Sequence, residues 1–208
     1  MAGLERYGLI DVPDSASELI SVVLHPLVRE ANALLADQAG ETDGHHEALE
    51  THLVEFAESC VKQGRSGWPV TRLLAPHLLG LPGLRSDASF ARVRDAIDSV
   101  AEQLEAAGQP AVTITLRQHV LDAERDQLGS THPDTLTSQS YLAGVLDSLG
   151  RYDEAEQLHR RALATRIDVL GPDHPNTLAS QNNLALLLQR REEHSVRQWA
   201  RFLRWRHR

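Results

Sequence analysis

The chain repeats itself at an interval of 42 residues. The segment His132-Pro133-Asp134-Thr135-Leu136 returns as His174-Pro175-Asn176-Thr177-Leu178, and Ser138-Gln139 and Leu142-Ala143 return as Ser180-Gln181 and Leu184-Ala185. Self-similarity with a period of roughly 20 to 50 residues is the sequence mark of a solenoid, in which each unit stacks on the next. An array of this kind builds a surface and supplies no reaction chemistry by itself, so the repeat constrains both fold and function.

Each copy of the repeat predicts a pair of helices. Pro133 and Pro175 suit the first turn of a helix, where the missing N–H is harmless. Apolar residues follow at helical spacing, Gly150 ends the first helix, and a second helix is expected to begin near Asp153. A weaker copy occupies residues 87–127, with a helix start at Asp87 to Ser89 and a turn at Gly108-Gln109-Pro110. Aromatic residues make up only 4% of the chain, which favours Leu- and Ala-rich helical packing over sheets.

The motif residues are similar to a known family. Leu142-Ala143, Gly150-Arg151-Tyr152-Asp153-Glu154-Ala155-Glu156 and Arg161-Ala162-Leu163 resemble the tetratricopeptide repeat, and the 42-residue period resembles its kinesin-light-chain variety. The resemblance implies an all-α, short helical solenoid of αα-hairpins over residues 86–190, amounting to about two and a half repeats. It also implies a non-enzymatic module that binds a protein or peptide segment.

The N-terminal part resembles a second family. Leu4 to Ile10 and Ser21 to Asn32 are similar to the end of the winged-helix module that precedes the repeats in bacterial NB-ARC signalling NTPases. Residues 1–30 are therefore expected to form a small winged-helix remnant, with a short helix closed by Leu4, Leu9 and Ile10 and a strand over Leu19–Leu24. Residues 31–85 are expected to form a helical connector. The resemblance implies the sensor arm of such an NTPase system.

Charge and composition restrict the partners. The net charge of −8 divides into +5 for residues 190–208, which hold seven arginines, and −13 for residues 1–189. The body of the chain therefore repels nucleic acid and anionic membranes, and only the tail attracts them. One cysteine, Cys60, excludes an internal disulfide framework and predicts a buried, inert thiol. No apolar run spans a bilayer and no signal peptide is recognised, so a cytoplasmic location is expected.

Catalytic and metal-binding motifs are missing from the sequence. There is no Gly-rich phosphate loop followed by Lys and no Gly-x-Ser-x-Gly elbow, so neither a nucleotide cofactor nor an enzymatic activity is predicted. His45, His46 and His52 lie among acidic residues and offer metal ligands in principle. A solvated, polar helix start explains the same pattern more simply, and no metal site is predicted.

Ligand contacts are expected on the first helix of each repeat, as the family resemblance implies for its concave groove. Carried over by register, the positions are Asp95, Asp98, Ser99 and Glu102 in copy one; Thr137, Ser140, Tyr141, Gly144 and Ser148 in copy two; and Asn182, Asn183, Leu186 and Arg190 in copy three. The amides would hold a peptide backbone, since each offers a donor and an acceptor. The acidic residues predict a ligand of basic character. A solvated polar face without a ligand is the alternative.

The third copy breaks after Gln189, where Arg191, Glu192 and His194 replace the expected motif residues. The Arg- and Trp-rich tail, residues 191–208, fits a capping helix, a truncation or a shifted reading frame. A disordered or read-through terminus is favoured over nucleic-acid or membrane binding through Arg and Trp. A nucleic-acid-binding regulator acting through the wing-like segment and this tail is the alternative function. So short an array is expected to self-associate or to use residues 1–85 as cover.

Overall fold

The computed structural model describes residues 10–11, 23–24, 42–79, 81 and 89–206, which fall into two units, Met1–Thr51 and His52–Arg208. In the first unit, strand β1 (Ile10–Asp11) pairs antiparallel with β2 (Val23–Leu24), and Ile10 lies opposite Leu24. The predicted strand is thus present at its last two residues. The predicted helix end at Ile10 is wrong, because Ile10 lies in a strand. Leu4, Leu9 and most of the winged-helix prediction lie outside the described residues.

Helices α3 and α4 lead into the repeats. Helix α3 (Thr42–Lys62) is followed by the 3₁₀ turn η1 (Gly64–Gly67) and by α4 (Trp68–Leu78). Gly67 is required at this corner, because a Cβ there would lie 2.1 Å from the Cys60 carbonyl oxygen. Cys60 is buried, as predicted, and burial raises the pKa of its thiol.

Gln103 joins this corner to the next helix, α5 (Phe90–Ala106). Its side-chain amide donates to the carbonyl oxygens of Cys60, Val61 and Gly64 at 3.1–3.3 Å, while its carbonyl oxygen accepts from the Thr71 hydroxyl. One buried amide therefore supplies donors to the carbonyl groups that the end of α3 leaves unpaired.

Replacing Gln103 with leucine is expected to lower the free energy of unfolding by about 2–3 kcal/mol, because it leaves buried carbonyl groups without donors. Leucine itself fits the position, since the equivalent residues of the next two repeats are the buried Val145 and Leu187. Urea denaturation followed by circular dichroism measures the change. Gln118→Leu is the control, since the Gln118 amide donates only to the exposed Asp122; equal losses for both variants would contradict the assignment.

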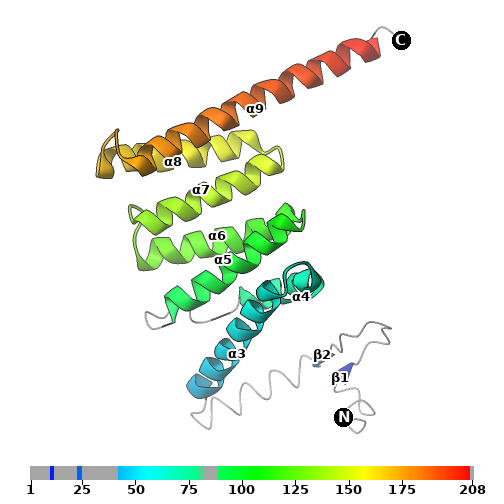
Figure 1. Ribbon diagram of the computed structural model, residues 1–208, viewed down its shortest axis with the longest axis vertical. Coiled ribbons are helices and arrows are strands. Elements are labelled where there is room, and N and C mark those ends of the chain that lie inside the picture. The colour runs from blue at the N-terminus through cyan, green and yellow to red at the C-terminus, as the bar shows by residue number, and fades with distance from the viewer. Residues whose placement is uncertain (1–9, 12–22, 25–41, 80, 82–88, 207–208) are drawn as a thin grey trace. The chain divides into compact units, whose positions relative to one another are not determined.

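Helices α5 to α9 form the stacked repeats, with each helix antiparallel to the next (Figure 1). They are α5, α6 (Pro110–Gln127), α7 (Pro133–Ser148), α8 (Tyr152–Leu170) and α9 (Pro175–Arg206). The predicted starts at Pro133 and Pro175 are confirmed. His132 and His174 cap these helices, since Nδ1 of each ring accepts from the backbone N–H two residues later, at 3.2 and 3.1 Å. Gly108 and Gly150 end α5 and α7 with positive φ angles of 72° and 74°, a conformation that favours glycine.

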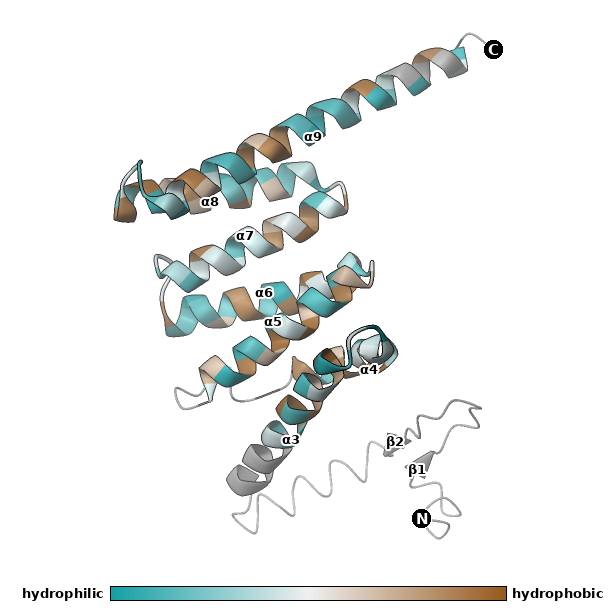
Figure 2. Cartoon of the chain, in the orientation of Figure 1, coloured by the Kyte–Doolittle hydropathy of each residue, from teal (hydrophilic) through white to brown (hydrophobic). Residues whose placement is uncertain are grey.

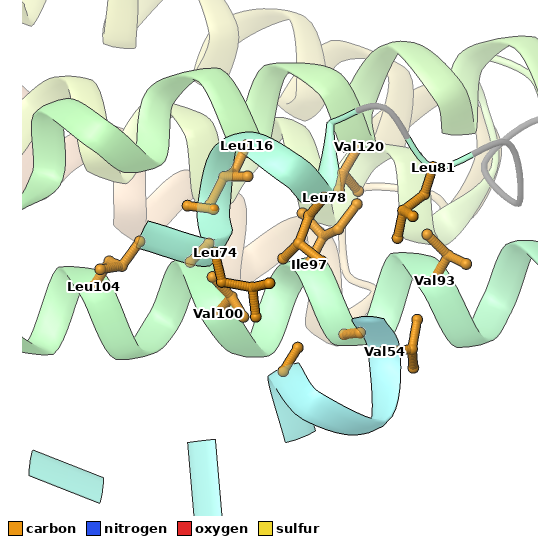
Figure 3. Packing of buried hydrophobic residues seen from close by; sticks show 14 of the residues in the cluster. Val54, Leu74, Leu78, Leu81, Val93, Ile97, Val100, Leu104, Leu116 and Val120 are labelled. Atoms are coloured by element: carbon orange, nitrogen blue, oxygen red, sulfur yellow. The ribbon is translucent and has the colours of Figure 1, made fainter. Parts of the chain in front are cut away.

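Two apolar clusters hold the stack together. The larger cluster joins α3, α4, α5 and α6 through residues that include Val54, Leu78, Ile97 and Leu116 (Figure 3). The smaller cluster joins α6, α7, α8 and α9 through Leu121, Leu142, Ala143, Leu146, Ala155 and Leu187. Ala143 and Ala155 are fully buried, so small side chains let neighbouring helices approach closely.

Helix α9 differs from the equivalent helix α7. Where α7 ends after 16 residues, α9 continues for 32 residues, across the boundary expected at residue 190. The ring of His194 packs against that of Tyr152 in the first turn of α8, at 5.4 Å between centroids. Beyond this contact α9 extends past the N-terminal end of α8 (Figure 1). Disorder, one of the two alternatives expected for this terminus, is therefore wrong as far as Arg206.

Candidate functional site

The predicted ligand residues occur at equivalent positions of three helices that run in the same direction, α5, α7 and α9 (Figure 1). We call this set the shared face: Asp95, Asp98, Ser99 and Glu102 on α5; Thr137, Ser140, Tyr141, Gly144 and Ser148 on α7; and Asn182, Asn183, Leu186 and Arg190 on α9. All thirteen are exposed or half-buried. Tyr141, near the middle, is 48% exposed.

A buried arginine connects α5 to α7 beneath the shared face. Arg117 of α6 is only 2% exposed, and its guanidinium lies 2.7 Å from Asp98 and 3.1 Å from Glu105. The same guanidinium stacks on the Tyr141 ring, with Cζ 4.9 Å from the centroid. Burial raises the pKa of Asp98, and the charge of Arg117 opposes this rise. Arg117 thus neutralises one predicted ligand residue and orients another.

The next layer has a second buried arginine. Arg166 of α8 donates to the hydroxyls of Ser140 and Thr137, each at 3.3 Å, and to that of Ser180. The hydroxyl groups of two shared-face residues, Thr137 and Ser140, therefore accept hydrogen bonds from a buried arginine beneath the face. Their hydroxyls position α7 against α8 and α9.

Arg190 of α9 also has an internal partner. Its guanidinium lies 2.8 Å from the carboxylate of Asp147 in α7, although Arg190 itself is exposed. Burial raises the pKa of Asp147, whereas Arg190 and His159 lower it. Burial lowers the pKa of His159 on α8. Among the described residues, Asp147 Oδ1 and His159 Nδ1 have no hydrogen-bond partner.

A buried carboxyl group lies between the first two layers. Glu124 of α6 is 1% exposed, and burial raises its pKa to about 7. Arg94 of α5 lies 3.8 Å from Glu124 but makes closer contacts, at 2.9 Å, with Asp95 and Asp134. Asp95 is thus paired with Arg94, although its side chain is 67% exposed.

These contacts divide the shared face. Asp95, Asp98, Thr137, Ser140 and Arg190 have internal partners on other residues, and the hydroxyls of Ser99 and Ser148 donate to backbone carbonyl groups of their own helices. Glu102, Tyr141, Asn182 and Asn183 present exposed polar side chains, and Leu186 presents an apolar side chain that is 44% exposed. The sequence reasoning missed Arg117, Glu124 and Arg166 altogether. In the sequence, the only indication of these residues was that each is a charged residue at a helix position flanked by the small and apolar core residues of the repeat.

The sequence reasoning also missed a hollow on a different side of the stack. It has a volume of about 200 Å³ and lies between α6, α7 and α8. Leu142, Leu146 and Leu158 form its apolar lining, and Gln118, Gln157 and the ion pair of Arg151 with Glu154 provide polar groups. The Arg151 guanidinium is 2.7 Å from Glu154, and this ion pair gives both polar residues of the motif a structural role without a ligand.

The described residues show no group of three His, Cys, Asp or Glu side chains placed to hold a metal ion. His45 and His46 lie in α3, and His52 of that helix lies 3.8 Å from Glu55. Within the same described part of the chain, no helix has the length and apolarity required to cross a bilayer.

The comparisons with known proteins agree with this architecture. Residues 135–176 match the family model of the tetratricopeptide repeat. A crystal structure of a Podosopora anserina protein, described as "kinesin light chain nearly identical TPR-like repeats", has a TM-score of 0.51 and 23% identity over 71% of this chain and 70% of that one. A single-substitution variant of that protein has a TM-score of 0.42 and 22% identity over 81% and 87%. No curated protein matches the chain. The fold is a tetratricopeptide-type helical solenoid.

Proposed function

We propose that this protein binds an extended peptide segment along the shared face of α5, α7 and α9, without catalysing a reaction. The observation that carries the proposal is Tyr141. Its ring is half exposed at the middle of the face and is held from below by the guanidinium of Arg117. A fixed aromatic side chain with one free surface loses little conformational entropy when a ligand packs on it.

The two neighbouring helices supply different polar groups. Asn182 and Asn183 are exposed on α9 and offer amides that can donate to and accept from a peptide backbone. Asp95 and Glu102 are exposed on α5 and offer carboxylates. We therefore expect a ligand with Lys or Arg at the end that lies over α5.

Such a module serves as a scaffold or as the sensor arm of a signalling NTPase system in the cytoplasm. The resemblance of the N-terminal segment to the NB-ARC proteins favours the sensor role, and it predicts a separate protein that supplies the nucleotide-binding domain. Loss of regulation of that protein when the present chain is removed is the expected result.

Selection from a random-peptide phage library, followed by fluorescence-anisotropy titration of the selected peptides, tests peptide binding. We expect enrichment of peptides with basic residues at one end. Tyr141→Ala is expected to weaken their binding by more than about tenfold, and Asn183→Ala by several-fold, since each removes a contact at the centre of an interface. Gln198→Ala is the matched control, because it removes an exposed amide of α9 that lies outside the shared face. Unchanged affinity in both shared-face variants would refute the site.

A further inference from the structure

Six residues of α9 form a line along the helix that we call the outer stripe: Leu178, Ala185, Gln189, Glu192, Val196 and Leu203. The intervals between them are 7, 4, 3, 4 and 7 residues. Intervals of three, four and seven residues keep side chains on one face of a helix. The order of residue types is also symmetric, with apolar residues at both ends and Gln189 and Glu192 at the centre. Figure 2 shows hydrophobic segments recurring along α9 towards its C-terminal end.

The outer stripe is exposed where its counterpart is buried. Leu136 and Ala143 occupy the equivalent positions of α7 and are 2% and 0% exposed, within the stack. On α9 the corresponding side chains are accessible to solvent: Leu178 is 49% exposed, and Ala185 is exposed as well. Val196, beyond the repeat, is 63% exposed. The stripe thus combines a face that this repeat normally buries with apolar residues that the tail adds.

The stripe points away from the rest of the stack. The most buried residues of α9 are Thr177, Ser180 and Leu187, which are at most 1% exposed. At 100° per residue, Ser180 and Leu187 lie on the side of the helix opposite to Leu178 and Val196, and Thr177 lies to one side. A shallow hollow lined by Gln189, Glu192, Glu193, Val196 and Arg197 also opens on the outer side. Another helix can therefore approach the stripe without displacing α8.

We propose that two copies of this chain pair through their outer stripes, with the two α9 helices antiparallel. A two-fold axis brings the same surface of two copies together in opposite directions. The residues at one end of that surface must therefore be complementary to the residues at its other end. The stripe meets that requirement: Leu178 faces the second copy's Leu203, Ala185 faces its Val196, and Gln189 faces its Glu192. The apolar ends are covered, and the Gln189 amide donates to the Glu192 carboxylate. The small side chain of Ala185 permits close helix packing.

The charge distribution favours a second copy over other occupants. Residues 190–208 carry +5, and the described repeat residues 89–189 carry −6, from 14 acidic and 8 basic residues. Antiparallel pairing sets the Arg-rich end of each α9 beside the acidic repeats of the other copy. A parallel arrangement would instead bring the two Arg-rich ends together, where like charges repel. Asn182 of the shared face lies four residues after Leu178 and three before Ala185, so the pairing competes with a ligand for that residue.

Sedimentation equilibrium of the full chain tests the pairing. We expect a monomer–dimer equilibrium for the wild type and more than about a tenfold rise in the dissociation constant for Val196→Glu, which places an unpaired charge in the interface. Circular dichroism of the variant is expected to match the wild type, because Val196 packs against nothing in the described chain. Gln198→Glu is the matched control, since it adds the same charge at an exposed position on another face of α9.

Thiol cross-linking tests the direction. Leu178→Cys and Leu203→Cys variants are mixed and oxidised; Cys60 is buried, so the introduced thiols are the ones that react. Antiparallel pairing predicts a disulfide in the mixture and none in either variant alone. Self-linking of Leu178→Cys would overturn the proposed direction. A wild-type chain that stays monomeric at every concentration would overturn the pairing itself and leave the stripe to another occupant, such as an anionic membrane.

Discussion

Replacing Arg117 with alanine is expected to lower the free energy of unfolding by about 3 kcal/mol, because removing one member of a buried ion pair leaves the other uncompensated. Arg117 is 2% exposed and is the common partner of Asp98 and Glu105. The side chains of these two acids are 23% and 34% exposed, so water recovers part of the lost interaction and the effect stays at the lower end of the usual range. The stacking on Tyr141 is lost as well.

Arg125→Ala is the matched control for this prediction. Arg125 lies on the same helix and pairs with Asp122 at 3.2 Å, but both side chains are substantially exposed. An exposed pair one turn apart contributes less than about 1 kcal/mol. Thermal and urea denaturation of the two variants compares a buried and an exposed arginine directly. If the losses of stability differ by less than about 1 kcal/mol, Arg117 is not the structural ion that its burial indicates.

Replacing Glu124 with glutamine is expected to stabilise the protein above pH 7 by up to about 3 kcal/mol, and to have little effect below pH 4.5. The pKa of Glu124 is raised from 4.5 to about 7, with burial as the largest cause. The folded state therefore holds the proton more tightly than the unfolded state does. The stability that this proton provides is complete below pH 4.5 and is lost as the pH rises towards 7. Glutamine stays neutral and removes that loss.

The measurement is the difference between the stability–pH profiles of the variant and the wild type. His159 contributes in the opposite direction, because its lowered pKa costs stability as the pH falls below its unfolded value of about 6.5. Its contribution is common to both proteins, so the difference isolates Glu124. Asp122→Asn is the control, because it makes the same change from acid to amide at an exposed side chain of the same helix. A flat profile for Glu124→Gln would show that Arg94 and Ser138 hold this group ionised at neutral pH.

The repeat frame could be predicted from the sequence, and the polar interior could not. The 42-residue offset located α7 and α8 and the start of α9, because Pro133, Gly150 and Pro175 act through local backbone geometry. The same offset said nothing about Arg117 and Glu124. Their positions correspond to His159 and Arg166, so the repeat does not preserve the residue type, and a charge on a helix is ordinarily read as solvent-exposed. Their burial depends on partners from other helices.

The tail shows a different limit of sequence reasoning. Loss of the motif at Arg191 indicates that the third hairpin is incomplete, but it does not distinguish a capping helix from a truncated or frame-shifted end. Helix propensity does not depend on the motif, and residues such as Arg, Glu and Leu continue a helix readily once it has started. The shared face was predicted only as a set of register positions. Which of its members are already occupied follows from contacts across helices, such as that of Arg190 with Asp147.

Ser138 and Ser180 lie one repeat period apart, and their partners are ionisable groups of opposite charge type, an acid for Ser138 and a base for Ser180. The side chain of Ser138 interacts with the Glu124 carboxyl group and lowers its pKa, whereas the Ser180 hydroxyl accepts from Arg166. A hydroxyl group can donate or accept, so the same repeat position tolerates an inversion of charge. Misassembly between similar neighbouring units is a characteristic folding failure of repeat proteins. Because of the inversion, the buried polar groups of one layer do not match those of the next. A helical hairpin that packs one layer away from its native position therefore meets the wrong partner, and such misfolded states are disfavoured.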